Sequence, residues 1–499
     1  MCCLGLARRS GFPEPAIHDE FGYLLGADTF VHGRLTNAEH PLALFFESPQ
    51  ILVRPSYVSK YPPGQSLVLA LGQKLFGAPY YGVVISGAVM MFLFTMTLVA
   101  WTAVVPGIAV SVVLGLLFLP PMYWAYSYWG GCLAAAGGAA VLLAFDCYGR
   151  DRPTAAGVMF GIGVLTLFFT RPYEGGVFAA AAVTGFGVRL YKERGRAALA
   201  GTRVFLLSAT PVIAAGLLWT GWYNTAVTGS PFRLPHLLHD SQYQTTPLFW
   251  LLPLRPDPLY SSPRLAAQHG RNGVEANAYR EERAGGFRKA VSLTLRSVYL
   301  IFGWSLALLL LVPFAWRDWR VRLLAVMLGV CLLCLSLETF HLPHYAAPLT
   351  TAIALLPACA ADKSWRIRIG SFPCGAVLTC LVFAAACAFP LKSAIQTARY
   401  GAGPDTSFQF ARARLIRRLS EMEGEHLVIV RYPWPPWRVG DEWVYNGAEI
   451  DSQRVVFAHD LGAKENGQLL RYYPQRRKWL LTFDGDVARL EPYQGREGE

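Results

Sequence analysis

Two short polar stretches near the start of the chain carry side chains that can do chemistry. Residues 18–23 contain the acidic pair Asp19 and Glu20, and residues 59–64 contain Lys60 beside a rigid Pro-Pro-Gly turn. A positioned carboxylate can remove the proton of a hydroxyl group as a general base. Lys and Arg can stabilise negative charge that develops on a departing phosphate. The pattern therefore predicts a transfer reaction in which a hydroxyl group attacks and an anionic group leaves.

Composition places this chemistry at a membrane. The 499 residues are 53% hydrophobic and only 16% charged, with a mean hydropathy of +0.32, whereas soluble domains average about 25% charged residues. The formal net charge of +12 arises from Lys and Arg in short loops between apolar runs. That distribution is typical of cytoplasmic loops in membrane proteins and does not indicate a nucleic-acid partner.

The apolar runs predict an all-α polytopic membrane protein. Residues 65–76 are apolar on one face, which is typical of a helix lying in the membrane interface. Hydropathy then predicts about ten crossings. They are residues 81–101, 108–122, 131–144, 154–170, 175–188, 204–222, 298–316, 323–337, 345–359 and 369–389.

Basic loops predict the orientation of these crossings. Loops at residues 149–152, 192–203, 317–322 and 363–368 are rich in Lys and Arg, and alternating crossings place all of them on one side. The positive-inside rule makes that side the cytoplasm. We therefore expect a bacterial plasma-membrane protein whose first segment and C-terminal region face the outside.

Three regions are predicted along the chain. Residues 1–77 form an outer first loop that bears the acidic pair, and residues 78–390 form the membrane domain with a long outer loop at 223–296. Residues 391–499 read as a small α/β domain. Its predicted elements are a helix at 408–422 and strands at 426–430, 454–458 and 479–483.

Two further groups of side chains have structural interpretations. Cys331 and Cys334 have the CxxC spacing, but they lie inside an apolar run and are expected to pack there without binding metal. Aromatic residues of the C-terminal domain can stack on sugars, but they more often fill a small core. They are Trp434, Trp437, Trp443 and Tyr445.

Other polar residues are predicted to gather on the outer face. Arg171 and Glu174 lie between two apolar runs, and His341 and His344 flank Pro343 in another turn. A local ion pair of Arg171 with Glu174 explains that pair equally well when it is considered alone. Convergence of several turns on one face favours a functional site, because ionisable groups at membrane depth are costly.

Motifs in this order resemble those of the GT-C glycosyltransferases, and the nearest branch is that of the protein O-mannosyltransferases and the lipid A aminoarabinose transferase. The resemblance rests first on Asp19, Glu20 and Tyr23, on Gly-Arg-Leu-Thr at 33–36, and on Lys-Tyr-Pro-Pro-Gly at 60–64. Further similarity lies in residues 128–131, 171–175, 228–231, His344, Tyr345 and Pro348.

This resemblance implies a function and a set of roles. The donor would be a polyprenyl-phosphate sugar, the acceptor a glycan, lipid or protein, and direct displacement would invert the anomeric centre. Asp19 would be the general base, with Glu20 beside it in positioning or metal binding. A divalent metal would be held by His344 or His341 with an acidic residue, and a membrane helix would precede the acidic pair, so we expect one to be missing ahead of Met1. The residues implied in substrate binding are Lys60, Tyr61, Arg171, Glu174, Arg34 and Tyr345.

Alternative functions remain open at this point. An O-antigen ligase or polymerase would use the loop at 223–296, with Arg233, His236, His239 and Arg255 as its essential residues. A secondary transporter is less favoured, because no inverted repeat and no interrupted pair of helices with midplane charges is visible. A non-catalytic scaffold whose outer domain binds glycan is the remaining interpretation.

Overall fold

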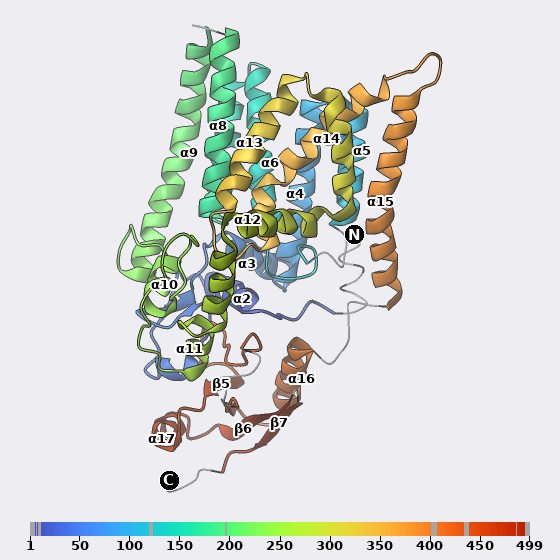
Figure 1. The fold of residues 1–499 in the computed structure, drawn as a ribbon. Coiled ribbons are helices and arrows are strands. Elements are labelled where there is room, and N and C mark those ends of the chain that lie inside the picture. The colour runs from blue at the N-terminus through green and yellow to red at the C-terminus, as the bar shows by residue number, and fades with distance from the viewer. Residues whose placement is uncertain are drawn as a thin grey trace.

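A bundle of long helices forms one end of the molecule, and a small sheet domain forms the other end (Figure 1). The computed structural model describes residues 5, 7, 11–118, 123–194, 197–400, 407–433, 439–485 and 487–494. The first segment of the chain lies between the bundle and the sheet domain.

The first segment contains two helices joined by a small antiparallel sheet. Helix α2 (His18–Val31) carries Asp19 and Glu20 in its first turn, where the helix dipole favours negative charge. Helix α3 (Gly64–Phe76) begins after Pro63. It is followed by Gly77, whose φ of 84° favours glycine. The elements between the two helices are β1 (Asn37–Ala38), η1 (Ala43–Phe46), β2 (Ile51–Leu52) and β3 (Ser56–Ser59). The sheet order is β1-β3-β2.

The bundle begins with six helices in succession. They are α4 (Tyr80–Trp101), α5 (Val104–Leu117), α6 (Cys132–Gly149), α7 (Pro153–Phe168), α8 (Pro172–Arg194) and α9 (Ala197–Thr228). The long loop carries α10 (Pro235–Tyr243), α11 (Pro263–His269) and the first part of α12 (Val274–Phe302). The bundle is completed by η2 (Gly303–Ala315), α13 (Trp319–Leu335), η3 (Pro343–Leu349), α14 (Thr350–Trp365) and α15 (Cys374–Tyr400).

Helix length and hydropathy identify a multi-pass membrane protein. Within the described residues, 6 segments are long and apolar enough to cross a membrane. Two shorter apolar helices, α5 and α7, fall below the roughly 20 residues that a perpendicular crossing needs. The qualifying segments are Tyr80–Trp101, Cys132–Gly149, Leu199–Thr228, Pro263–Ala315, Pro343–Trp365 and Cys374–Lys392.

The predicted apolar runs fall largely on helices, with local differences: the run at 345–359 begins in the 3-10 helix η3, the run at 369–389 begins five residues before α15, and residues 119–122 lie outside the described residues. The run at 298–316 begins in α12 but continues as the 3-10 helix η2. Gly303 interrupts the α-helix with a φ of 50°, and Pro313 lacks the backbone N–H of an α-helical turn. The predicted class, a helical membrane protein with a small C-terminal α/β domain, is confirmed.

The C-terminal domain is a four-stranded sheet with order β5-β4-β6-β7. Strand β4 pairs in parallel with β5 and β6, while β7 pairs antiparallel with β6. The predicted helix and the three predicted strands are all present. The elements are α16 (Phe408–Glu421), β4 (His426–Val430), β5 (Val455–His459), α17 (Ala463–Tyr472), β6 (Arg477–Asp484) and β7 (Val487–Pro492).

The first segment and the C-terminal domain share one hydrophobic cluster. Phe21 of α2 stacks on Tyr445 with ring centroids 4.0 Å apart, and both side chains are buried. Trp443 is buried in the same cluster, as expected for a core residue. Trp434 and Trp437 lie outside the described residues. The core therefore ties the opening of the chain to its C-terminal region.

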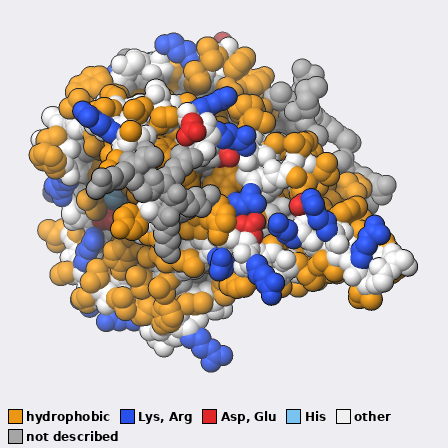
Figure 2. Space-filling model, turned by 90° about the horizontal axis from the view of Figure 1, so that it is seen from above, with side chains coloured by type: hydrophobic (Ala, Val, Ile, Leu, Met, Phe, Trp, Pro, Cys, Tyr) orange, Lys and Arg blue, Asp and Glu red, His pale blue; other side chains and the backbone are white. Residues whose placement is uncertain are grey.

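The basic turns meet at the end of the bundle that lies away from α2 and the sheet domain (Figure 1). Gly149, Arg150, Trp319 and Arg320, from two of those turns, line one cavity there. Seen from above, Figure 2 shows Lys and Arg side chains spread over this face, with a few acidic side chains among them. Basic side chains thus gather at this end of the bundle.

Candidate active site

Small residues let α2 lie against the Lys-Tyr-Pro-Pro-Gly turn. A Cβ at Gly22 would come within 3.1 Å of the Tyr61 ring, and one at Gly26 would come within 2.4 Å of Ser66 Oγ. Gly64 N donates a hydrogen bond to Phe169 O at 2.8 Å, which joins the start of α3 to the turn after α7. These contacts bring residues 19, 61 and 171 to one place.

Asp19 and Glu20 are neighbours in sequence but have different surroundings. Asp19 is partly exposed, and its Oδ2 accepts a hydrogen bond of 2.6 Å from Trp129 Nε1. Glu20 is buried, and its two carboxylate oxygens accept hydrogen bonds of 2.8 Å from the backbone N–H groups of Ala16 and Tyr128. Burial raises the pKa of Glu20, and these backbone donors oppose that effect. Glu20 therefore connects backbone segments, whereas Asp19 faces the polar site.

Tyr61 lies beside the Asp19 carboxylate, and Lys60 lies near the Tyr61 ring. Burial raises the pKa of Tyr61 well above its ordinary value, and the charge of Asp19, which also shares a hydrogen bond with Tyr61, adds to this effect. The Tyr61 ring lies 4.7 Å from the Tyr23 ring, centroid to centroid. Lys60 Nζ lies 5.5 Å from the Tyr61 centroid. A base, a hydroxyl group and a cation are thus close together.

Arg171 supplies a second, largely buried cation. Its guanidinium carbon lies 4.7 Å from the centroid of the Tyr345 ring, and Nη1 lies 3.7 Å from Glu174 Oε1. Arg171 also interacts electrostatically with Tyr23 and Asp19. The local ion pair with Glu174 that the sequence allowed is therefore present, and the same arginine faces the Asp19 site.

His344 joins the cluster through Trp129. Its ring centroid lies 4.6 Å from that of Trp129, whose indole N–H is the one bound to Asp19. His344 Nδ1 lies 3.2 Å from the Tyr123 hydroxyl, and its buried Nε2 has no hydrogen-bond partner among the described residues. By contrast, His341 uses both ring nitrogens, toward Thr294 Oγ1 at 3.1 Å and Glu282 Oε1 at 2.7 Å.

The implied metal ion finds no ready set of ligands. Within the described part of the chain, no group of three or more His, Cys, Asp and Glu side chains is arranged to hold a metal ion. His344 and Asp19 both contact Trp129, an indole that offers no metal ligand. The donor set of this cluster therefore does not fit a protein-held metal.

The long loop at 223–296 approaches Lys60. Although burial acts to raise it, the nearby His239, whose Nδ1 lies 3.8 Å from Asp240 Oδ1, and the charge of Lys60 lower the pKa of Asp240 to about 2. Burial, assisted by the charge of Lys60, lowers the pKa of His239 to about 3. Neither ring nitrogen of His239 has a hydrogen-bond partner within conventional distance among the described residues. Burial lowers the pKa of His236, and the charge of Lys60 adds to this effect.

Three other predicted residues lie apart from Asp19. Arg34 Nη1 forms an ion pair of 2.9 Å with Glu449 Oε1 of the C-terminal domain, while its buried Nε and Nη2 have no partner in the described part of the chain. Arg233 donates to Ser241 Oγ at 2.6 Å, and Arg255 N donates to Thr245 O at 2.8 Å. Both of these loop arginines are exposed.

Three residues that sequence reasoning did not assign to the site belong to it by position. Trp129 contacts both Asp19 and His344, and Tyr23 packs against Tyr61. Glu338 is 2% exposed, and burial, assisted by the charge of Glu174, raises its pKa well above the ordinary value. Tyr23 and Trp129 belong to motifs noted in the sequence, and the Gly-Gly pair after Trp129 adopts φ of 89° and 128°, a conformation that favours glycine.

Fold and site together define a multi-pass helical membrane protein with a polar, partly buried cluster between its helix bundle and its first segment. No protein-family model matches the chain, and no curated protein matches it.

Several solved structures are similar to the chain. Two are of ArnT from Cupriavidus metallidurans, in the apo state and bound to undecaprenyl phosphate; each is 14% identical over 96% of this chain and 91% of its own, with a TM-score of 0.49. Another is the Archaeoglobus fulgidus oligosaccharyltransferase in its apo form, which is 11% identical over 84% of this chain and 59% of its own, with a TM-score of 0.49.

Proposed function

We propose that the protein is a GT-C-type glycosyltransferase that transfers a sugar from a polyprenyl-phosphate donor to an acceptor hydroxyl group, with Asp19 as the general base. The observation that carries the proposal is the meeting of Asp19, Tyr61, Arg171 and Tyr345, four residues from separate parts of the chain, in one cluster. A carboxylate beside cations is what attack by a hydroxyl group and departure of a phosphate require.

The roles follow from the contacts. Asp19, held by the Trp129 indole, takes the proton of the acceptor hydroxyl as its oxygen attacks the anomeric carbon. The bond from that carbon to the phosphate oxygen breaks, and the phosphate leaves with the electron pair. Arg171 stabilises its negative charge, because Glu174 and the Tyr345 ring fix the guanidinium. One displacement inverts the anomeric centre, and no step is assigned to a metal ion.

We also propose that this cluster faces the outside of a bacterial plasma membrane. The basic turns lie at the opposite end of the bundle, and the positive-inside rule assigns such turns to the cytoplasm. The donor lipid and a glycan, lipid or protein acceptor would then meet at the outer surface. Labelling a cysteine placed beside residue 18 in intact cells tests this orientation, and labelling only after lysis would contradict it.

Replacing Asp19 by Asn tests the enzyme directly, because the amide keeps the shape and removes the base. We expect a loss of transfer of about 100-fold or more with an unchanged amount of protein in the membrane. The measurement is mass analysis of surface glycans and lipids from cells that lack the gene and carry either the parent or the variant. Asp362→Asn, an exposed carboxylate at the basic end, is the matched control and should behave as the parent.

The position of the long loop favours a second candidate, a glycan ligase or polymerase. His239 and Asp240 lie within electrostatic reach of Lys60, so the loop has its own base beside a cation. In that case His239→Gln abolishes glycan transfer while Asp19→Asn retains it. A transporter would instead move solute across sealed vesicles, and an enzyme of the proposed class would not.

A further inference from the structure

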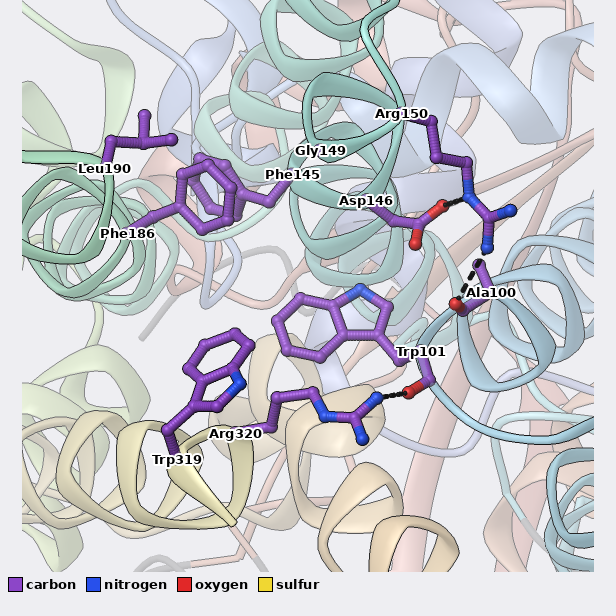
Figure 3. A pocket seen from close by; sticks show the side chains of 10 residues that line it. All are labelled: Ala100, Trp101, Phe145, Asp146, Gly149, Arg150, Phe186, Leu190, Trp319 and Arg320. Carbon is purple, nitrogen blue, oxygen red and sulfur yellow. Dashed lines mark hydrogen bonds and ion pairs between the residues drawn. The ribbon is translucent and has the colours of Figure 1, made fainter. Parts of the chain in front are cut away.

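A cavity lies at the basic end of the bundle, and Figure 3 shows the side chains that line it. Its lining residues include none of the Asp19 cluster. Its volume of about 360 Å³ falls within the range of small-ligand sites. It is enclosed by the C-terminal ends of α4 and α6, by α8 and by the start of α13. The residues that define its chemistry are Trp101, Phe145, Asp146, Arg150, Trp319 and Arg320.

Aromatic rings form the walls of this cavity. Figure 3 shows the Trp101 and Trp319 indoles and the rings of Phe145 and Phe186 around the opening. The Phe145 and Phe186 rings stack with centroids 4.1 Å apart, and Trp101 Nε1 donates to Leu142 O at 3.0 Å. These contacts fix the rings. Such aromatic cages attract cations, in particular the ammonium groups of ligands.

A carboxylate and two guanidinium groups complete the lining. Asp146 Oδ2 accepts from Arg150 Nε at 2.7 Å, and Arg150 Nη2 donates to Ala100 O at 3.1 Å. Arg320 donates to Trp101 O from Nη1, and its Nη2 donates to Asp318 Oδ2 at 3.0 Å. A carboxylate accepts about four hydrogen bonds and a guanidinium donates about five, so both kinds of group retain capacity for a ligand.

The balance of charge decides which ligand fits. Each arginine is already paired with an aspartate, Arg150 with Asp146 and Arg320 with Asp318. A purely anionic headgroup would therefore enter a locally neutral cluster and lie close to the Asp146 carboxylate. A zwitterion satisfies both signs, with its cation against the rings and Asp146 and its phosphate against the guanidinium groups. A primary ammonium can also donate hydrogen bonds to Asp146, which a quaternary ammonium cannot do.

We propose that this cavity binds the headgroup of a phospholipid that carries a primary amine, of the phosphatidylethanolamine type. The location supports a lipid, because the cavity lies at the ends of membrane helices and is flanked by Trp, a residue enriched at membrane interfaces. Leu190 of α8 adds an apolar wall. This site is independent of the transfer reaction proposed above.

Native mass spectrometry of the purified protein with lipids of identical acyl chains tests the site. We expect phosphatidylethanolamine to be retained about tenfold better than phosphatidylcholine or phosphatidylglycerol, the size of one charge-assisted hydrogen bond. Asp146→Asn should abolish this preference. Asp362→Asn removes the same kind of pair, an Asp that accepts from an Arg four residues later at 3.0 Å, and should retain the preference. An unchanged preference in Asp146→Asn would overturn the proposal.

A second variant and a soluble probe cover the remaining outcomes. Phe186→Leu keeps an apolar side chain but removes one wall of the cage, and it should weaken retention of the ethanolamine lipid a fewfold. Soluble O-phosphoethanolamine should compete weakly, and inorganic phosphate should not compete. Competition by O-phosphoethanolamine at the same concentration as the lipid would assign the cavity to a soluble amino-phosphate. That result would overturn the proposal that the ligand is a lipid.

Discussion

Charged residues are held in different ways at the two ends of the helix bundle. At the basic end the ion pairs are local, as in Arg150–Asp146 and Arg366–Asp362, each four residues apart, and their arginines are exposed. At the other end some charged side chains are buried and have partners from distant parts of the chain. Arg264 of the long loop pairs with Glu442 of the C-terminal domain at 2.9 Å, with side chains 4% and 1% exposed.

The difference separates residues that orient the protein from residues that organise a site. Exposed local pairs contribute little to stability, about 0–1 kcal/mol, and can be read from sequence spacing. A buried pair is costly to break, because removal of one partner leaves an unpaired charge. Such pairs are retained where a specific arrangement is required, which is the case around Asp19. The following predictions test this contrast.

The largest effect is expected at the buried pair that ties the long loop to the C-terminal domain. Arg264→Leu leaves Glu442 buried without its cation and removes a guanidinium that lies 3.8 Å from the Tyr432 centroid. We expect a loss of about 3–5 kcal/mol, measured as a fall in apparent melting temperature and as faster proteolysis of the outer domain. Arg366→Leu is the control at the basic end and should change stability by about 1 kcal/mol or less. Equal melting temperatures for the two variants would show that the buried pair contributes no more to stability than the exposed pair does.

A smaller effect, on transfer alone, is expected from Arg171→Lys. Lysine keeps the positive charge but loses the planar group that stacks on Tyr345 and pairs with Glu174. We expect transfer to fall about 100-fold with little change in protein amount. Arg150→Lys is the same substitution at the basic end, and its transfer should match that of the parent. A parent-like rate in Arg171→Lys would remove Arg171 from the reaction.

A pH effect is expected from a buried carboxyl group near the site. Burial raises the pKa of Glu47 from 4.5 to about 7, against the opposing effect of the Tyr243 hydroxyl. The folded state therefore binds this proton more tightly, so the stabilisation is complete below about pH 4.5 and is lost as pH rises through 7. Glu47→Gln should raise the melting temperature relative to the parent at pH 8 but not at pH 4. Glu39→Gln, at an exposed carboxylate, should show no such pH-dependent difference.

The smallest effect is expected at Arg34. Its ion pair with Glu449 joins side chains that are 36% and 45% exposed. Arg34→Gln should therefore change stability by no more than about 1 kcal/mol and leave transfer unaltered in the surface-glycan measurement. A tenfold loss of transfer would instead support the substrate-binding role predicted from its motif.

Local sequence determined most of the fold. Apolar runs of suitable length predict helices such as α4 and α6, because backbone groups in a membrane must be satisfied within the segment. Short apolar runs likewise predicted strands β4, β5 and β6. The basic turns were visible in the sequence, and they meet at one end of the bundle. These features depend on neighbours only a few residues apart.

The candidate site was predicted only in part. Asp19, Lys60, Tyr61, Arg171 and Tyr345 were singled out as residues, but their closeness could not be derived from spacing. It depends on the close approaches at Gly22, Gly26 and Gly64, where a Cβ would collide with a distant segment. Trp129 was noted only as part of a motif at residues 128–131 and given no role in the site, because an indole in an aromatic stretch is typical of a membrane anchor.

What the sequence determined by itself was therefore the class of the protein, its elements and the kinds of reactive groups it carries. Tertiary structure alone decided that Asp19 faces the site while Glu20 binds backbone amides, that Arg34 pairs with Glu449, and that Asp146 shares a cavity with several aromatic side chains. The physical reason is the separation along the chain of the residues that interact. Helix and strand formation depends on local hydrogen bonding and periodicity, whereas burial and pairing of a charge depend on which remote segments pack against it.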